Sequence, residues 1–362
     1  MLGALAGRTF TRLGTKRHLL WATLLCAAAC GTSTDTAKTT EPDPSPVGAG
    51  FGTSSSGGSS SGLDGPPFDC VSTSPPAKAD PSRVEIASAF AGTYKAYVLG
   101  ALPGIPASRL GGTMLSPSDP NMLLVAVNSD TASGAIAQVK VRRDACGHIT
   151  GFDGDATIFS QTPFVDANLL LGPNKVLFYS RWPENKLSEI PLSSGTATTY
   201  TIALSTVGVA GGGPGGIGFV PPNLKDPGGL RAVTWPDGFW YHLTYEPSGA
   251  TFKITESEQI TTLSNGPGGF AYVPQGSPGF PKQSIITCEW DVDKVVVYDA
   301  DEQGDPANAS RSVFFTKFPK PWGAYFEPKT GDFIFLTWGG ALDEVYIVRG
   351  FTPPPPPPDS PK

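Results

Sequence analysis

Histidine is scarce in this chain, and so is charge. Its 362 residues include 3 histidines and 5 cysteines, and only 16% of all residues are charged. Catalytic zinc and non-haem iron sites are built largely from histidine. His148 and His242, the two histidines outside the N-terminal region, are therefore too few for a histidine-rich metal centre. No nucleophile–base–acid motif stands out either, so the sequence does not identify an enzyme.

Basic surfaces and helical patterns are missing as well. The formal net charge is -6, and the first 29 residues carry four basic and no acidic residues, so the remainder carries -10. A chain this acidic is repelled by phosphate backbones, which argues against nucleic-acid binding. With 44 glycines and 37 prolines there is little room for long helices, and no long stretch keeps a 3.6-residue apolar period. The composition indicates an all-β protein.

A six-residue segment ending in proline recurs along the chain. Its five copies are GTMLSP (112–117), NLLLGP (168–173), GIGFVP (216–221), GFAYVP (269–274) and GAYFEP (323–328). The prolines are 56, 48, 53 and 54 residues apart. Position four is always large and apolar, and position one is Gly in four copies and Asn168 in the other. Because Gly and Asn best tolerate a positive φ, we expect a turn at position one that leads into a short buried strand.

Each copy is followed by further strand-like segments, which gives about four short strands per unit. Four strands at a period near 50 residues predict a β-propeller of five blades. The last unit ends after three strands, so we expect the N-terminal segment RVEIASAF, from Arg83, to complete that blade and close the ring. A sixth blade is the alternative if TYKAYVLGAL, from Thr93, belongs to another sheet. An open solenoid of repeated sheets is a further alternative.

The N-terminal region has the pattern of an export signal. Residues 1–29 combine basic residues with the apolar run LLWATLLCAAA, followed by Cys30 and Gly31. This resembles the lipobox of bacterial lipoproteins, with Ala27 where that family usually has Leu. The resemblance implies that Cys30 becomes the first residue, carries diacylglycerol and palmitate, and anchors the protein in the cell envelope. The absence of Asp after Cys30 implies the outer membrane.

Four regions follow from these patterns. We expect a lipoprotein signal peptide over residues 1–29, a Ser/Gly/Pro-rich disordered linker over 30–66, a β-propeller over 67–352 and a Pro-rich tail over 353–362. The linker would let the propeller stand away from its membrane.

Cysteines and acidic loops give two weaker hypotheses. Export permits disulfides, and Cys70 and Cys146 both lie in turn-like segments, so we expect them to pair. Cys288 lies in an apolar strand and is expected to be a buried thiol. Asp299, Asp301 and Gln303 occupy positions 1, 3 and 5 of a calcium-loop pattern, but position 12 is Ser instead of Glu. That loop is either a solvated hairpin loop or a weak Ca²⁺ site, and no other cofactor is expected.

The most suggestive pattern is aromatic. Trp182, Trp235, Trp290 and Trp338 each end the second strand of their unit, whereas the first unit has Asn128-Ser129-Asp130 there. Ring symmetry should bring the four indoles to one face, beside the acidic residues Glu184, Asp237 and Asp291. Two explanations remain open. The indoles are either wedges packed between blades or the lining of a mouth that grips a ligand.

The signal and the repeat layout together resemble bacterial surface lipoproteins with propellers of the broad NHL, YncE or lactonase-like kind. The resemblance includes no active-site motif. We therefore expect a membrane-tethered binding or scaffold propeller that recognises a protein or a glycan, and not an enzyme. The alternative is a metal-assisted hydrolase or lactonase with its site at the propeller axis.

Overall fold

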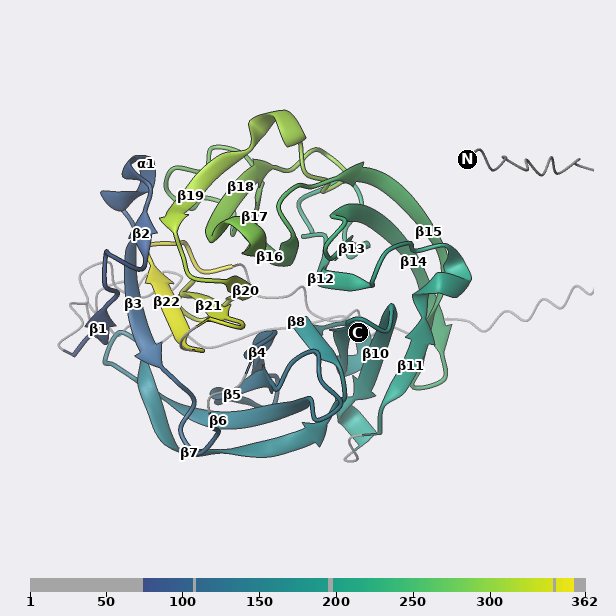
Figure 1. Cartoon of the computed structure of the whole chain (residues 1–362), viewed down its shortest axis with the longest axis horizontal. Coiled ribbons are helices and arrows are strands. Elements are labelled where there is room, and N and C mark those ends of the chain that lie inside the picture. The colour runs from purple at the N-terminus through teal and green to yellow at the C-terminus, as the bar shows by residue number, and fades with distance from the viewer. Residues whose placement is uncertain (1–73, 107–108, 195–197, 341–342, 355–362) are drawn as a thin grey trace, which may run out of the picture. The chain divides into compact units, whose positions relative to one another are not determined.

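The computed structural model describes residues 74–106, 109–194, 198–340 and 343–354. These residues form a five-bladed β-propeller, as the sequence predicts (Figure 1). The first three blades are blade 1, β4 (Thr113–Ser116), β5 (Asp119–Val127), β6 (Ala135–Arg143) and β7 (Ile149–Gln161); blade 2, β8 (Val165–Leu171), β9 (Val176–Arg181), β10 (Lys186–Pro191) and β11 (Tyr200–Ala203); and blade 3, β12 (Pro214–Phe219), β13 (Leu230–Thr234), β14 (Phe239–Ser248) and β15 (Thr251–Thr262).

Blades 4 and 5 each include strands from the N-terminal part of the described sequence. They are blade 4, β16 (Pro267–Tyr272), β17 (Ser284–Glu289), β18 (Lys294–Asp299) and β19 (Ser312–Lys317) with β2 (Glu85–Ile86); and blade 5, β20 (Pro321–Phe326), β21 (Phe333–Thr337) and β22 (Val345–Arg349) with β3 (Lys95–Gly100) and β1 (Ala77–Lys78). All neighbouring strands are antiparallel, and the first strand of each blade lies innermost in Figure 1. Among the described residues no helix is long and apolar enough to span a bilayer.

The ring is closed by an N-terminal strand, but not by the one expected. Strand β3 pairs with β22, with Tyr97 opposite Ile347, and so completes blade 5. The segment from Arg83 pairs only through β2, where Ile86 lies opposite Phe315 at the outer edge of blade 4. The one-turn helix α1 (Ser88–Ala91) interrupts that segment and carries the chain from blade 4 to blade 5. Since the strand from Thr93 belongs to the fifth sheet, the sixth blade is excluded.

Apolar side chains fill every gap between neighbouring blades. Five separate clusters of buried residues lie at the five interfaces between blades. Blade 5 packs on blade 4 through Phe335 against Phe315, and on blade 1 through Ile347 and Leu336. Because this last blade touches both neighbours, the sheets form a closed ring and not an open solenoid. Each cluster removes large apolar areas from water, which is the main stabilising term of the fold.

Glycines at the axis serve a different purpose from the one expected. Gly216, Gly269 and Gly323 lie inside the inner strands, and none of them has a positive φ. A Cβ on Gly216 would lie 2.6 Å from the carbonyl oxygen of Gly268, and one on Gly323 would lie 2.1 Å from that of Gly111. The prediction of a positive φ at position one of the repeat was therefore wrong. Glycine is required in these blades because a Cβ at this position would meet backbone atoms of a neighbouring blade.

The left-handed residues come earlier in the repeat, three positions before the axial residue in blades 3, 4 and 5 and four positions before it in blade 2. Gly213 and Gly266, the first glycines of the two GPGG segments, have φ of 116° and 59°. Phe164 and Lys320 occupy the same place in blades 2 and 5, with φ of 63° and 46°. The turn that leads into the inner strand thus exists, and it precedes the axial glycine.

Asn168 is the one exception to glycine at the axial position. Its side chain is 4% exposed and reaches across the axis to the inner strands of three other blades. The side-chain Oδ1 accepts hydrogen bonds from the backbone N–H groups of Ile217 (3.2 Å) and Phe270 (3.3 Å). Its Nδ2 donates to the carbonyl oxygens of Phe270 (3.4 Å) and Ala324 (3.3 Å). One amide therefore ties together blades 2, 3, 4 and 5 in the space that the glycines leave.

Candidate functional site

One hydrogen bond marks equivalent positions in the five blades. The backbone N–H at the end of each second strand donates to the residue just before the inner strand of the same blade. The pairs are Ser129 to Arg109, Trp182 to Phe164, Trp235 to Gly213, Trp290 to Gly266 and Trp338 to Lys320. Four blades thus place a tryptophan at this position, and blade 1 places Ser129 there.

The four tryptophans, which we call the tryptophan arc, contact one another in ring order. The ring centroids are 4.9 Å apart for Trp182 and Trp235, 5.9 Å for Trp235 and Trp290, and 5.4 Å for Trp290 and Trp338. The interplanar angles of 84°, 90° and 69° make each contact edge-to-face. Trp322 of β20 is 2% exposed and lies 5.8 Å from Trp235 and 5.6 Å from Trp338.

The tryptophan arc connects neighbouring blades by hydrogen bonds and is also partly exposed to solvent. The indole N–H of Trp182 donates to the backbone oxygen of Trp235 at 3.1 Å, and that of Trp290 donates to the backbone oxygen of Trp338 at 3.0 Å. All four indoles are only half-buried, however. The geometry therefore contains elements of both explanations: the indoles contact one another across neighbouring blades, and the four residues are partly exposed.

Acidic side chains surround the arc at the rim. Asp237 and Asp291 are exposed, at the turns that follow Trp235 and Trp290. Glu184 is partly exposed and pairs with Arg181 and, at 3.0 Å, with Lys186. The three acidic residues that accompany the tryptophans in the sequence thus lie beside the arc, and two of them have carboxylates open to solvent.

The arc is interrupted at blade 1, between Trp338 and Trp182. Ser129 is fully buried, and its hydroxyl has no hydrogen-bond partner. Next to it lies Asp130, which interacts with Asp166 at the start of β8. Asp166 is fully buried and accepts a hydrogen bond from the indole N–H of Trp322 at 2.7 Å. We call Ser129, Asp130 and Asp166, with Arg109 and Trp338 beside them, the blade 1 gap.

Burial raises the pKa values of both carboxyl groups of the gap. Burial raises the pKa of Asp166 well above its usual range, and the neighbouring Asp130 raises it further. Burial also raises the pKa of Asp130, while Asp166, Arg109 and Trp338 oppose that shift. Because two neighbouring carboxylates repel each other, ionisation of either carboxyl group opposes ionisation of the other. Burial raises the pKa of the nearby Asp343 to about 6.

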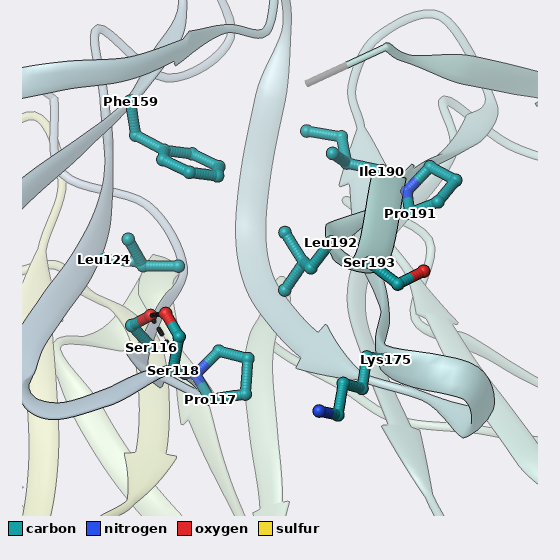
Figure 2. Close-up of a pocket in the computed structure, with 10 residues that line it drawn as sticks. All are labelled: Ser116, Pro117, Ser118, Leu124, Phe159, Lys175, Ile190, Pro191, Leu192 and Ser193. Carbon is teal, nitrogen blue, oxygen red and sulfur yellow. Dashed lines mark hydrogen bonds between the residues drawn. The ribbon is translucent and has the colours of Figure 1, made fainter. Parts of the chain in front are cut away.

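A cavity of about 670 Å³ opens at the opposite ends of the strands, between blades 1 and 2. Figure 2 shows its walls, which come from the turns after β4 and β8 and from the end of β10. Its lining mixes polar and apolar surface, with Lys175 as the one charged side chain among the residues shown; the others are Ser116, Pro117, Ser118, Leu124, Phe159, Ile190, Pro191, Leu192 and Ser193. None of these residues belongs to the candidate site residues that the sequence singled out.

The loop with the calcium-like pattern is docked on blade 3. Asp301 Oδ1 accepts the backbone N–H groups of Gln303 and Asp305, at 2.8 and 3.0 Å, and Asp299 pairs with Lys282 at 2.8 Å. Asp301 is thus engaged with the N–H groups of its own turn. No cluster of three or more His, Cys, Asp or Glu side chains suited to a metal is found in the described ranges.

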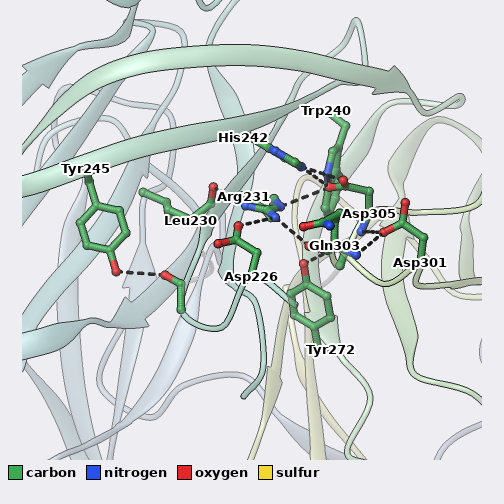
Figure 3. Close-up of polar contacts among 12 residues, drawn as sticks. Asp226, Leu230, Arg231, Trp240, His242, Tyr245, Tyr272, Asp301, Gln303 and Asp305 are labelled. Atoms are coloured by element: carbon green, nitrogen blue, oxygen red, sulfur yellow. Dashed lines mark hydrogen bonds and ion pairs between the residues drawn. The ribbon is translucent and has the colours of Figure 1, made fainter. Parts of the chain in front are cut away.

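Figure 3 shows what holds this loop in place. Asp305 is 4% exposed and accepts hydrogen bonds from Trp240 Nε1 at 2.8 Å and from the fully buried Arg231 at 3.2 Å. His242 Nε2 lies 2.7 Å from the same carboxylate. Arg231 Nη2 also donates to the backbone oxygen of Gln303 at 2.7 Å. These contacts join blade 3 to blade 4, so His242 serves the blade interface.

The structure describes some of the cysteines about which the sequence makes predictions, but not all of them. Cys146 is disulfide-bonded, and Cys70 lies outside the described range, so their pairing remains a prediction. Cys288 is a free thiol in β17, and burial raises its pKa. Cys30 and the two segments 1–29 and 30–66 also lie outside the described range.

Sequence reasoning missed Asp130, Asp166 and Asn168 as site-forming residues. Signals for two of them were nevertheless visible. Asn168 replaces glycine at the axial position, and Asn128-Ser129-Asp130 replaces tryptophan at the end of a second strand. Asp166 has no counterpart in the repeat pattern, and the packing of blade 2 on blade 1 brings it beside Asp130.

The chain matches no protein-family model and no curated protein sequence. Its structure is similar to those of β-propeller proteins. An auxiliary nutrient binding protein from Bacteroides ovatus is 12% identical, with a TM-score of 0.41 over 71% of this chain and 76% of that chain. A virginiamycin B lyase from Staphylococcus aureus is 13% identical, with a TM-score of 0.36 over 71% and 99%. The Malassezia sympodialis allergen Mala s 1 is 12% identical, with a TM-score of 0.39 over 70% and 88%. These similarities concern the fold and assign no activity.

Proposed function

We propose that this protein is a binding propeller of the cell envelope, which recognises a protein or a glycan at the tryptophan arc. The observation that carries the proposal is the interrupted arc. Four half-exposed indoles lie edge-to-face around one end of the axis, and the fifth position opens onto Asp130 and Asp166. Aromatic faces beside carboxyl groups suit stacking on sugars and gripping of peptide side chains.

Attachment to a membrane is the second part of the proposal. The signal-like residues 1–29 and the Cys30-Gly31 pair support export followed by lipid attachment at Cys30. The Ser- and Gly-rich residues 30–66 would then hold the propeller at a distance from the bilayer. In cells of the source, mass spectrometry of the N-terminal peptide should show an acylated Cys30. An unmodified N-terminus elsewhere in the chain would contradict lipid attachment.

The first test of binding compares variants on glycan and protein arrays. Trp182 lies at the free end of the arc, next to the blade 1 gap, so Trp182→Ala should lower array binding at least tenfold. Tyr200→Ala is the matched control, because Tyr200 is an aromatic side chain that is 46% exposed on β11, in the outermost strand of blade 2. Thermal unfolding of each variant separates lost binding from lost folding. Unchanged binding by a folded Trp182→Ala protein would contradict the proposal.

A hydrolase is the second candidate, and the neighbouring carboxyl groups of Asp130 and Asp166, whose pKa values burial raises, favour it. A carboxylic acid held beside a carboxylate is a pattern that enzymes use for general acid and base catalysis. A panel of lactones and esters should then show turnover that Asp166→Asn abolishes, with calcium analysis of the same protein. An inactive wild-type protein across the panel would leave the binding function.

A further inference from the structure

Two basic residues of the chain already lie over the tryptophan arc. Lys320 Nζ is 4.1 Å from the ring centroid of Trp290, and the guanidinium carbon of Arg109 is 4.9 Å from that of Trp338. Both distances are in the range of cation–π contacts. The arc thus has an intrinsic affinity for positive groups, and the two residues show where such groups lie.

These two residues differ in how they are held. The Lys320 ammonium pairs with Asp293 at 3.3 Å and donates to the backbone oxygen of Trp290 at 3.3 Å. Arg109 is exposed, and within the part of the chain that the structure describes its guanidinium makes no hydrogen bond or ion pair. Lys320 is therefore a fixed part of the arc. The Arg109 side chain is held over Trp338 by the indole face and by long-range attraction alone.

The carboxyl groups that attract Arg109 are incompletely paired. Asp130 and Asp343 both feel its positive charge, yet neither forms an ion pair with it. One oxygen each of Asp130 and Asp166 is buried, and their partners are the other carboxyl group and, for Asp130, the Trp338 indole; the fully buried hydroxyl of Ser129 has no hydrogen-bond partner. Buried polar groups are nearly always hydrogen-bonded. The blade 1 gap thus has unused hydrogen-bonding capacity next to a loosely held guanidinium.

We propose that the blade 1 gap binds the guanidinium group of an arginine side chain on a protein ligand, which replaces Arg109 over Trp338 and pairs with Asp130. This inference rests on the proposed binding function and names its ligand class. A guanidinium can stack on an indole and at the same time form a charge-assisted hydrogen bond to a carboxylate, whereas a neutral sugar brings no positive charge to either group. The exposed rim carboxylates Asp237 and Asp291 and the net charge of the chain would steer a basic partner toward this face.

Arg109 and Asp130 would then have opposite roles in binding. Arg109 acts as a competitor that the ligand must displace, so its removal should strengthen binding. Asp130 supplies the counter-charge, so its neutral isostere should weaken binding. The two substitutions therefore shift affinity in opposite directions, a pattern that a merely structural role for either residue would not produce.

The test uses a pair of short peptides that differ in one charge. The probes are acetyl-Gly-Arg-Gly-amide and acetyl-Gly-citrulline-Gly-amide, which have nearly the same shape, and only the first is positively charged. Binding to the ¹⁵N-labelled protein is followed by NMR through the indole N–H signal of Trp338, assigned with Trp338→Phe. We expect the arginine peptide to shift this signal in a saturable way and the citrulline peptide to leave it at least tenfold less affected.

Three variants complete the experiment. Arg109→Ala should bind the arginine peptide about fivefold more tightly, and Asp130→Asn at least fivefold more weakly. Asp153→Asn, at an exposed carboxylate on β7 in the outermost strand of blade 1, should change affinity less than twofold. Arg109 is exposed, so its variant is expected to fold, and it keeps the test decisive if Asp130→Asn unfolds. Equal binding of both peptides, or weaker or unchanged binding by Arg109→Ala, would overturn the inference.

The outcome also separates this inference from the function on which it rests. Suppose that the arrays reveal a ligand lost in Trp182→Ala, but neither the wild-type protein nor Arg109→Ala binds the arginine peptide. The binding function then stands and the arginine site is wrong. If Trp182→Ala leaves array binding intact and the arginine peptide still fails, both are wrong.

Discussion

Replacing Asn168 by glycine should destabilise the propeller more than any surface change. Glycine is the residue that four of the five units carry at this position, so the substitution makes blade 2 conform to the repeat. The change removes both acceptor and donor functions of a 4% exposed amide. The backbone N–H groups of Ile217 and Phe270 then lose their acceptor, and the carbonyl oxygens of Phe270 and Ala324 lose their donor.

The magnitude follows from these orphaned groups. Each buried N–H group without a partner costs about 1–3 kcal/mol, which gives about 2–6 kcal/mol for the two. The additional backbone freedom of glycine in the unfolded chain adds about 1 kcal/mol. We therefore expect the free energy of unfolding to fall by about 3–7 kcal/mol. A propeller of ordinary stability, about 5–15 kcal/mol, would lose a large share of it.

Urea unfolding followed by tryptophan fluorescence and by circular dichroism would measure the change. Asn223→Gly is the matched control, because Asn223 is exposed and bonds only to the side chain of Gln283. It should shift the free energy by less than about 1 kcal/mol. If Asn168→Gly unfolds within about 0.5 kcal/mol of the wild-type protein, the axial amide does not hold the blades together, and the reasoning fails.

Two further predictions concern buried carboxyl groups. Glu189 is fully buried, accepts the N–H of Phe252 at 2.9 Å, and burial raises its pKa to about 7. Because the pKa of Glu189 in the folded protein lies above the value in the unfolded chain, the folded state loses stability as pH rises from about 4.5 to 7 and the carboxyl group ionises. In urea unfolding, the Glu189→Gln variant should therefore be as stable as the wild-type protein at pH 4 and more stable by about 1–3 kcal/mol at pH 8. Equal stability of the two proteins at pH 8 would contradict this. Arg143→Ala removes the 3.0 Å partner of the fully buried Glu327 and should cost about 3 kcal/mol in the same assay, whereas the exposed Lys253→Ala, which removes a surface pair with Glu246, should cost less than about 1 kcal/mol.

Much of the architecture could be predicted because the sequence pattern of one blade occurs five times. The proline-ended segment and the four-strand period lead directly to five blades and to the shared position of the four tryptophans. The N-terminal strands could not be assigned in the same way, because each occurs once. The segments from Arg83 and from Thr93 both alternate, and only the placement of Phe90 and Tyr94 in the aromatic cluster between blades 4 and 5 decides which strand goes where.

The function of the glycines was misjudged for a related reason. A recurrent glycine has two common causes, a positive φ and the close approach of another backbone, and one unit read alone does not separate them. At Gly216 the cause is the carbonyl oxygen of Gly268, 52 residues away in the sequence, which a Cβ would meet at 2.6 Å. That distance exists only once five inner strands share one axis.

Two positions of this propeller break its fivefold repeat. At the axial position Asn168 replaces glycine, and one amide ties four blades together. At the tryptophan position Ser129 replaces tryptophan, which brings Asp130 beside Asp166 and leaves Trp338 facing Arg109 instead of a fifth indole. A wedge role alone would be served best by a fifth tryptophan, since it would fill the space and extend the edge-to-face contacts of the other four indoles. At blade 1 the contact that a fifth indole would make is absent, and two buried carboxyl groups lie in its place. Restoring the symmetry with Ser129→Trp, together with Asp130→Asn, should therefore block ligand binding at this face while leaving the other four blades packed as before.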